Sequence, residues 1–361
     1  MSTDACLRHL EALVACDTQN PPRTIDGDSR VFAYCRDVVG SGFEVRTWDH
    51  GDGHVTWYAV RGKPSVLFNV HLDTVPTGDG WSTDPHRLAL KEGRAYGRGS
   101  CDIKGAAAVL LTLAEQGAKN LALLFTTDEE GEGGCCVDSF LADGLAEGYR
   151  QVVVAEPTAC QSVLAHRGYL SVKGWFEGTP GHSSEARALD DNAIHALALW
   201  SGAALEVARK RKKSPEDPGS CFNIGRIEGG TKSNVIAGRS FVHWSARLGP
   251  GQSNRAFLRE LEACTPAGAR ARWEVPFAGK PLPACGRKTD RAERFAREHG
   301  LDIGRPVDFW TEASIFSAAG LPAMVLGPGN IAQAHQTDEW VAVEQLERAM
   351  EIYRTVVEYD V

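Results

Sequence analysis

Short runs of hydrophobic residues, separated by helical patterns, organise the first part of the chain, and a similar run follows much later. The runs cover residues 66–70, 121–126, 152–155 and 323–326, and residues 103–116 between the first two are rich in alanine and leucine. Continuous hydrophobic runs that alternate with helices are typical of buried parallel strands covered by helices. We therefore expect an α/β domain in which helices lie on both faces of a mostly parallel sheet.

A different pattern occupies residues 166–276, where the order is strand, helix, strand, strand, helix, strand. The two helical patterns lie near residues 192–210 and 252–264, and the run 241–248 alternates between hydrophobic and polar residues. Such alternation is typical of an antiparallel sheet with one face in water. The order predicts a ferredoxin-like α+β unit. We expect this unit to interrupt a first domain made of residues 1–165 and 277–361.

Composition supports two globular domains and argues against a nucleic acid partner. The chain has 361 residues, of which 43% are hydrophobic and 24% charged, and its formal net charge is −8. This length exceeds what one compact core usually holds. A negative protein repels phosphate backbones. The only basic run, residues 209–213, follows a helical pattern and is interpreted as a solvated helix end, where cations are favoured.

No targeting or membrane segment is apparent, so we expect a cytoplasmic protein that does not contact a membrane. The first 17 residues alternate charged and hydrophobic residues at helical spacing, unlike a secretory signal. The longest hydrophobic stretches, such as residues 106–114, are shorter than the roughly 20 residues that cross a bilayer. Ten cysteines are scattered without a CxxC pair, and neighbours such as Cys135 and Cys136 rarely bridge each other. Reduced thiols are expected.

Acids and histidines follow each hydrophobic run of the first domain. Asp102 directly precedes the helix predicted from residue 103. Ligands bind at the carboxyl ends of parallel strands, so these residues should converge on one edge of the sheet. We call the following six residues the strand-end cluster: His71, Asp102, Glu129, Glu130, Glu156 and His335.

Each member of the strand-end cluster has an ordinary interpretation when taken alone. Asp102 could cap the following helix, and Glu129 and Glu130 could be solvated loop acids. Together, however, two histidines and four carboxylates would repel strongly unless cations neutralise them. The cluster therefore predicts a metal site. Nitrogen and oxygen ligands without cysteine suit zinc, cobalt or manganese better than calcium or magnesium.

Two neighbouring residues are assigned separately. Cys101 is interpreted as a small hydrophobic neighbour of Asp102, because adjacent residues on an extended segment point in opposite directions. Asp73 lies two residues after His71, hence on the same face, where its carboxylate could hold the imidazole ring. Its alternative role is to form a turn with Thr74.

Six motifs resemble, in order, those of the acetylornithine deacetylase and succinyl-diaminopimelate desuccinylase family of metallohydrolases. They are HLDTVP, GRGSCDIKG, TTDEEG, AEPT, GTPGHSS and GPGNIAQAHQTDE, and they cover nearly the whole chain. The resemblance implies two divalent metal ions, zinc or cobalt, of which the first is bound by His71 and Glu156. It implies that Glu130 and His335 bind the second ion and that Asp102 bridges the two. Glu129 then falls on the general base.

The resemblance also assigns roles within the inserted segment and implies a homodimer formed through it. His182 matches a histidine that reaches across the dimer interface to stabilise the tetrahedral oxyanion. Asn234 and Arg247 match groups that bind the substrate α-carboxylate, for which a planar guanidinium is well suited. The chain departs from the family pattern at Ser245, where an acid commonly stands two residues before the arginine.

Within that family, the stretch TEAS at residues 311–314 is most similar to the acetylornithine deacetylase branch. The resemblance implies a small N-acyl amino acid substrate, either N-acetyl-L-ornithine or N-acetyl-L-citrulline, deacetylated in arginine biosynthesis. Desuccinylase and dipeptidase activities remain alternatives with the same chemistry. A non-catalytic binding relative would have no reason to keep a base such as Glu129 beside metal ligands. A dinucleotide enzyme would need a glycine-rich turn directly after a strand, and Gly97 does not follow a clear one.

Overall fold

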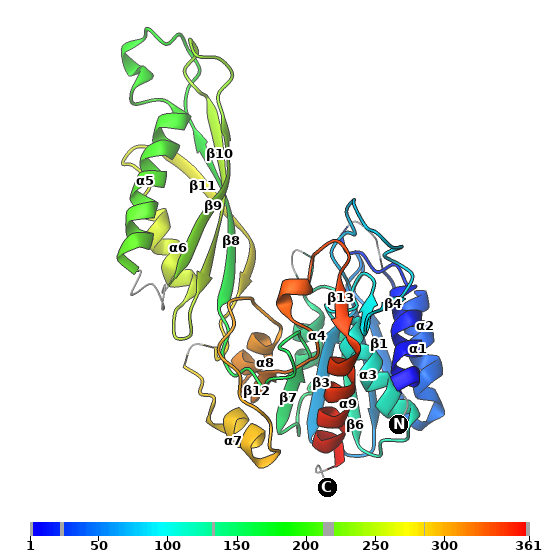
Figure 1. Ribbon diagram of the computed structural model, residues 1–361. Coiled ribbons are helices and arrows are strands. Elements are labelled where there is room, and N and C mark those ends of the chain that lie inside the picture. Colours follow the sequence, from blue (N-terminus) through cyan, green and yellow to red (C-terminus); the bar gives the residue numbers. More distant parts are fainter. Residues whose placement is uncertain (1–2, 22–24, 132–133, 212–219, 285, 359–361) are drawn as a thin grey trace. The chain divides into compact units, whose positions relative to one another are not determined.

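The computed structural model describes residues 3–21, 25–131, 134–211, 220–284 and 286–358, and it divides into two compact units (Figure 1). Unit 1 comprises Met1–Ala165, Arg287–Pro306 and Thr311–Val361, and unit 2 comprises His166–Gly286 and Val307–Trp310. Unit 2 extends beyond the expected residue 276, because strand β11 (Arg270–Gly279) pairs with β8 (Gly168–Glu177) as far as Gly279. Val307 returns to form a bridge with His166.

A six-stranded sheet forms the centre of unit 1. Its order is β1 (Glu44–Asp49), β2 (Val55–Arg61), β6 (Leu121–Thr126), β3 (Val66–His71), β7 (Gln151–Val154) and β12 (Ala323–Val325). Strands β6, β3, β7 and β12 are parallel neighbours, whereas β2 is antiparallel to both β1 and β6. The four predicted strands are therefore confirmed. They are buried along their whole length, as continuous hydrophobic runs require.

Helices cover both faces of this sheet, as expected. Trp57 and Tyr58 are adjacent on β2 and so point to opposite faces. Trp57 belongs to the hydrophobic core that contains α1 (Thr3–Val14), α2 (Arg30–Val39), α3 (Lys104–Glu115) and α9 (Val343–Glu358). Tyr58 instead packs on Phe140 of α4 (Cys136–Ala142), which contacts α8 (Ala313–Ala319). Helix α7 (Asp290–Glu298) also belongs to unit 1.

Helix α3 is buried on nearly every side, because α1, α2 and α9 pack around it and its alanines allow close approach. Truncation of a buried leucine such as Leu110 should cost about 2–5 kcal/mol of unfolding free energy. Near the start of α3, a small sheet with the order β13 (Trp340–Ala342), β5 (Arg94–Tyr96) and β4 (Ala89–Lys91) joins distant parts of the chain. This pairing brings residue 339 beside residues 97–102, which the hydrophobic pattern did not predict.

Unit 2 has the expected ferredoxin-like topology. Its antiparallel sheet has the order β11, β8, β10 (Arg239–Leu248) and β9 (Cys221–Gly229). Alternate residues of β10 are buried, including Val242 and Trp244, and pack on α5 (Ala193–Arg211) and α6 (Asn254–Glu262). Ser253 accepts the N–H of Ala256 and thereby caps α6. One-turn 3-10 helices lie at Gly40–Gly42, Ala186–Ala188 and Ile331–Gln333.

Three further expectations concern the cysteines, the basic run and membrane-spanning helices. The nine cysteines within the described residues are free thiols, and Cys285 lies outside them. The basic run ends α5 with Arg209, Lys210 and Arg211, while residues 212 and 213 lie outside the described part of the chain. No helix among the described residues is long and hydrophobic enough to span a membrane.

Candidate metal centre

The carboxyl ends of three neighbouring strands bring the strand-end cluster together. His71 is the last residue of β3, Glu129 and Glu130 follow β6, and Glu156 follows β7. Because β3 is parallel to both β6 and β7, all three strands end at the same edge of the sheet. The predicted convergence is therefore observed in the structure.

Asp102 lies at the centre of the cluster and contacts both histidines. Its Oδ1 is 3.1 Å from His71 Nε2, and its Oδ2 is 3.3 Å from His335 Nε2. The carboxylate is buried in the turn that precedes α3. One carboxylate that faces two imidazole nitrogens with its two oxygens has the geometry of a bridging ligand.

His71 also contacts Glu156, whose Oε1 lies 3.4 Å from His71 Nε2. The other ring nitrogen, Nδ1, lies 3.0 Å from the carbonyl oxygen of Asp73 and 3.5 Å from Asp73 Oδ1. Asp73 Oδ2 accepts the backbone N–H of Glu130 at 3.0 Å. Asp73 therefore orients the imidazole ring so that Nε2 faces the carboxylates, and it links the ends of β3 and β6.

His335 completes the cluster from the loop before β13. It has a positive φ of 59°, and its Nε2 lies 2.8 Å from Glu130 Oε1. Its side chain is 51% exposed, whereas His71 is almost fully buried. The two histidine positions therefore differ in their access to solvent.

The pKa values of the cluster reflect an excess of buried negative charge. Burial raises the pKa of Glu156 well above its usual value and also raises that of Glu130. Burial alone would lower the pKa of His71, but Glu156, Asp102 and Asp73 raise it well above the usual value. Contacts with Asp102 and Glu130 raise the pKa of His335 to about 10. In this arrangement the histidines take up protons where a cation would otherwise balance the carboxylates.

Glu129 differs from the other three acids of the cluster. Each of those three, Asp102, Glu130 and Glu156, contacts a histidine in the geometry described above, and none of these contacts involves Glu129. Burial raises the pKa of Glu129 well above its usual value, and the like charges of Glu130 and Glu156 raise it further. A carboxyl group with a raised pKa can accept a proton near neutral pH and later return it.

The donor set fits a metal ion. His71, Asp102 and Glu130 each offer one ligand atom, and these atoms lie within 4.8 Å of one another. With Glu156 and His335 the cluster has imidazole nitrogens and carboxylate oxygens and no thiolate, which suits borderline divalent cations. The thiol next to Asp102 in the sequence, Cys101, is buried, and its Sγ lies 3.4 Å from the carbonyl oxygen of Asn330.

Glu339 is a buried acid whose role the sequence analysis did not foresee, although it lies within the quoted motif AHQTDE. Its Oε1 accepts the N–H groups of Cys101 and Asp102 at 2.9 and 3.0 Å, and its Oε2 accepts that of Gly99 at 2.9 Å. Arg98, also buried, donates to Oε2 at 2.8 Å. Glu339 therefore fixes the backbone that carries Asp102.

Glu312 is a second buried acid near the same edge of the sheet. Its Oε2 accepts the hydroxyl of Thr126, the last residue of β6, at 3.0 Å. Burial and the charge of Asp128 raise the pKa of Glu312 to about 8. The TEAS stretch contains this residue, but no strand precedes it, so the pattern of strand ends could not identify it.

The three remaining predicted site residues, His182, Asn234 and Arg247, lie in unit 2. His182 and Asn234 are both exposed and lie on adjoining segments, since His182 pairs with Val235 and the N–H of Ser183 donates to the carbonyl of Asn234. His182 Nδ1 is 2.7 Å from the hydroxyl of Ser184. The structure therefore brings these two candidates together.

Arg247 lies at the other end of the same sheet. Its guanidinium stacks on Tyr169 at 3.9 Å from the ring centroid, near the start of β8, whereas His182 follows the end of β8. The ladder runs from Arg247 opposite Tyr169 to Arg239 opposite Glu177. At about 3.3 Å per residue, this is a separation of roughly 25 Å.

A model of peptidase family M20/M25/M40 matches residues 67–359. The chain is 44% identical over 358 residues to an N-acetyl-L-citrulline deacetylase of Xanthomonas campestris pv. campestris, and the match covers 97% of both proteins. It is 31% identical over 343 residues to an acetylornithine deacetylase of Proteus mirabilis, covering 89% of this chain and 87% of that protein.

Solved structures agree at the level of the fold. An M20 family metallo-carboxypeptidase from Sulfolobus solfataricus superposes with a TM-score of 0.75 and 16% identity, covering 98% of both chains. The resemblance drawn from the six motifs is thus confirmed by a match over most of the chain and by relatives of high identity. This chain belongs to peptidase family M20/M25/M40.

Proposed function

We propose that this protein removes the acetyl group from N-acetyl-L-citrulline, releasing acetate and L-citrulline in a cytoplasmic route of arginine biosynthesis. The observation that carries the proposal is the contact of Asp102 with both His71 and His335 at the carboxyl ends of the strands. The 44% identical relative, an N-acetyl-L-citrulline deacetylase, supports the choice of substrate.

Two divalent ions, zinc or cobalt, are proposed to bind here, the first through His71 and Glu156 and the second through Glu130 and His335, with Asp102 between them. Bound ions of this kind acidify water and polarise a carbonyl group. The distances around Asp102 support this division, because Oδ1 faces His71 and Oδ2 faces His335. Asp73 would keep His71 in the orientation that presents Nε2.

Glu129 is proposed to carry the proton. It takes a proton from the attacking water while the oxygen of that water bonds to the amide carbon. It returns the proton to the nitrogen as the carbon–nitrogen bond breaks, so the products are a carboxylic acid and a free amine. Its place directly before Glu130, just after the end of β6, supports this role.

His182, Asn234 and Arg247 are proposed to act in one site that takes residues from two chains. Within one chain, Arg247 lies roughly 25 Å from the His182 end of the sheet, a separation that exceeds the length of an N-acetyl amino acid. A site that contains all three roles therefore requires His182 and Asn234 from a partner. There, His182 would stabilise the oxyanion and Arg247 the substrate carboxylate.

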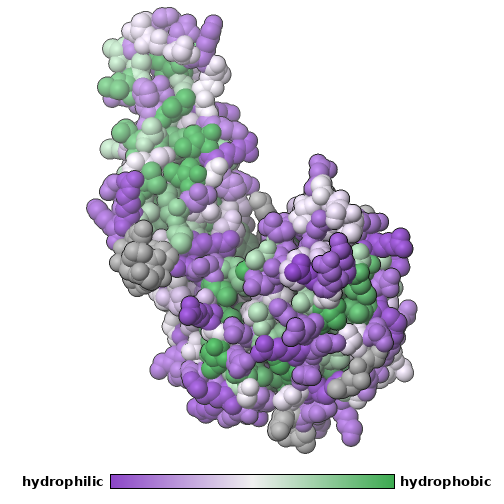
Figure 2. Space-filling model, in the orientation of Figure 1, coloured by the Kyte–Doolittle hydropathy of each residue, from purple (hydrophilic) through white to green (hydrophobic). Residues whose placement is uncertain are grey.

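A homodimer through unit 2 is supported by its surface. Strand β9 lies at the edge of the sheet, and unpaired edges of this kind readily add another strand. Leu199 of α5 is 65% exposed and Ile227 of β9 is 55% exposed. Figure 2 shows hydrophobic residues on the surface over the part of unit 2 that includes α5. Exposed hydrophobic residues in such numbers are typical of a protein interface.

N-acetyl-L-ornithine is the second candidate substrate, because relatives at about 30% identity are acetylornithine deacetylases. A cationic ornithine chain needs an acid in the pocket, whereas the neutral ureido group of citrulline needs paired hydrogen-bond partners. N-succinyl-diaminopimelate and dipeptides are alternatives with the same reaction chemistry.

The test is to load the protein with zinc or cobalt and to measure kcat/KM on a panel of amides. The panel contains N-acetyl-L-citrulline, N-acetyl-L-ornithine, N-succinyl-L,L-diaminopimelate and a dipeptide, and Glu129→Gln is the control for contaminating hydrolases. We expect the highest kcat/KM for N-acetyl-L-citrulline. A higher kcat/KM for N-acetyl-L-ornithine would change the substrate assignment. If none of the amides is hydrolysed, the proposed function is wrong.

A further inference from the structure

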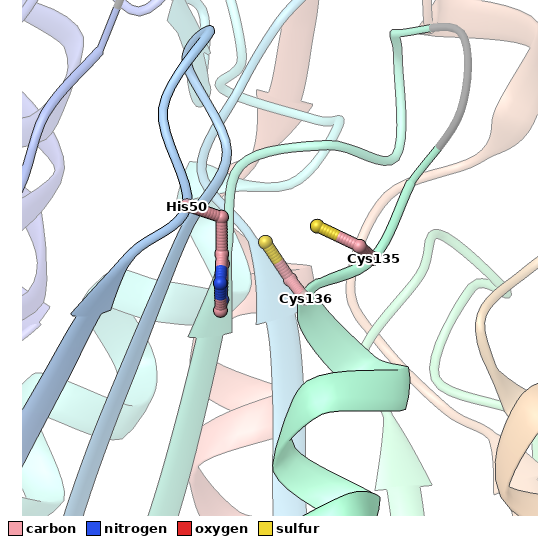
Figure 3. A group of neighbouring side chains, drawn as sticks. All are labelled: His50, Cys135 and Cys136. Carbon is pink, nitrogen blue, oxygen red and sulfur yellow. The ribbon is translucent and has the colours of Figure 1, made fainter.

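A group of soft ligands lies beside the strand-end cluster but shares none of its residues. His50 directly follows β1, and Cys135 and Cys136 stand where α4 begins. Figure 3 shows the two sulfur atoms and the imidazole ring turned toward a common space between the strand and the helix. Each residue offers one ligand atom, and these atoms lie within 4.8 Å of one another.

Two of the three residues are held together before any ion binds. The hydroxyl of Thr56 donates to the carbonyl oxygen of Cys136 at 3.2 Å and lies 3.1 Å from His50 Nε2. Thr56 is buried on β2, the strand that pairs with β1. One rigid strand therefore fixes both the imidazole and the backbone of the buried cysteine, as supporting contacts do around metal ligands.

The backbone of the cysteine pair is fixed from the other side by Asp128. Its Oδ2 accepts the N–H groups of Cys135 at 2.5 Å and Cys136 at 2.8 Å. Figure 3 shows both sulfur atoms on the side of the cysteine pair that faces His50, and the three ligand atoms lie within 4.8 Å of one another. The pair presents its sulfur atoms in a defined position and does not hang from a free loop.

A second grouping of His54, Asp128 and Cys135 also places three ligand atoms within 4.8 Å. It is the weaker site, because Asp128 Oδ2 already accepts two backbone N–H groups and lies 3.3 Å from His54 Nδ1. An ion that took this oxygen would leave the two N–H groups without their acceptor, at a cost of about 1–3 kcal/mol each. The grouping of His50, Cys135 and Cys136 does not require an oxygen of Asp128.

We propose that His50, Cys135 and Cys136 form a binding site for a thiophilic cation, Zn²⁺ foremost, that is separate from the catalytic metal centre. Two sulfur ligands and one imidazole match the ligand types of tetrahedral zinc sites, and water can occupy the fourth position because His50 is exposed. Binding releases the two thiol protons to solvent and forms two metal–sulfur bonds. The ion joins the end of β1 to the start of α4.

Cobalt spectroscopy tests the site without using activity as the readout. The protein is freed of metal, reduced with a phosphine and titrated with Co²⁺. Thiolate ligands produce an intense near-ultraviolet charge-transfer band, whereas the proposed catalytic ligands are nitrogen and oxygen only. We expect the band in the parent protein and its loss in Cys135→Ser and His50→Gln. Cys264→Ser, which changes a half-buried thiol of unit 2, should keep it.

The ligand assignment has its own test. If His54→Gln abolishes the band while His50→Gln keeps it, the site is the other grouping and the proposal is wrong. Absence of any such band in the parent protein also overturns it.

A measurement on the unmodified sequence avoids the need for a variant that folds. Zn²⁺ should slow iodoacetamide alkylation of Cys135 at least about tenfold while leaving the exposed Cys221 unprotected. Equal alkylation of Cys135 with and without Zn²⁺ refutes the site.

Discussion

The residues of the strand-end cluster lie close together within one chain, whereas the predicted site residues of unit 2 do not all lie together. In unit 1, His71, Asp102 and Glu156 are buried at the end of the central sheet, and His71 contacts both acids. In unit 2, His182 and Asn234 are exposed, and Arg247 lies at the opposite end of the strands. Under the proposed function, metal binding depends on the fold of one chain, whereas substrate recognition depends on how two chains assemble.

The two regions also differ in electrostatics. Buried carboxylates carry a desolvation cost that a cation removes, so metal binding and the stability of unit 1 are coupled. The exposed groups of unit 2 have no such cost, and their substitution should leave folding intact. The predictions that follow use this contrast, from the largest expected effect to the smallest.

Removal of the metal ions should abolish hydrolysis, and zinc or cobalt should restore it. Chelation would take away the ions that are proposed to activate water. We would measure the rate of acetate release and the metal content by elemental analysis before and after chelation. Full activity in protein shown to be metal-free would remove the dinuclear mechanism.

Glu129→Gln should lower kcat by roughly 10²–10⁴ while both ions stay bound, because the amide cannot accept the proton of water. Metal content by elemental analysis separates this effect from loss of the site. Glu147→Gln, a change of an exposed acid, is the matched control and should leave kcat unchanged. Near-normal turnover in Glu129→Gln would show that another group acts as the base.

His182→Ala should lower kcat by about 10²–10³ through loss of an oxyanion donor, with metal content unchanged. Mixed His182→Ala and Glu129→Gln chains should form heterodimers in which one of the two sites has both functional residues. These heterodimers should recover up to about half the parent activity, far more than either variant shows alone. Heterodimers without recovery would place His182 in its own chain's site or outside catalysis.

Glu339→Gln should weaken metal binding about 10–100-fold, because the residue orients the backbone of Asp102. It also leaves the buried Arg98 without its charged partner, so the melting temperature should fall. Glu344→Gln changes an exposed acid of α9 and serves as the control. Unchanged metal affinity, measured by competition with a chelator, would limit Glu339 to a purely structural role.

The last prediction concerns the pH dependence of stability in metal-free protein. The pKa of His335 is raised to about 10 from an unfolded value of 6.5, so its contribution to stability is complete below pH 6.5. That contribution disappears as the pH rises through 10. The difference in unfolding free energy between the parent and His335→Gln, from denaturant titrations, should therefore shrink across this window. A constant difference would show that His335 does not gain protonation on folding.

The sequence predicted site residues whose surroundings come from neighbouring positions along the chain. It did not predict site residues that are brought together by the pairing of distant segments. The buried strands β3, β6 and β7 were recognisable because both faces are hydrophobic, and His71 and Glu156 follow such strands directly. Glu339 was missed because its function depends on N–H groups more than 230 residues earlier in the chain. His50 and Cys135 likewise come together only through the packing of β1, β2 and α4.

The order of elements along the chain also affects synthesis. Strand β12, His335 and helix α9 all follow unit 2, yet they complete the sheet, the strand-end cluster and the core of unit 1. A nascent chain that has just finished unit 2 still exposes one edge of the sheet at β7 and the hydrophobic side of α3. Contacts of such long sequence separation form late and slowly. Residues 323–358 must therefore be synthesised before the strand-end cluster can assemble, and until then unit 1 exposes hydrophobic surface of the kind that makes folding intermediates prone to aggregate.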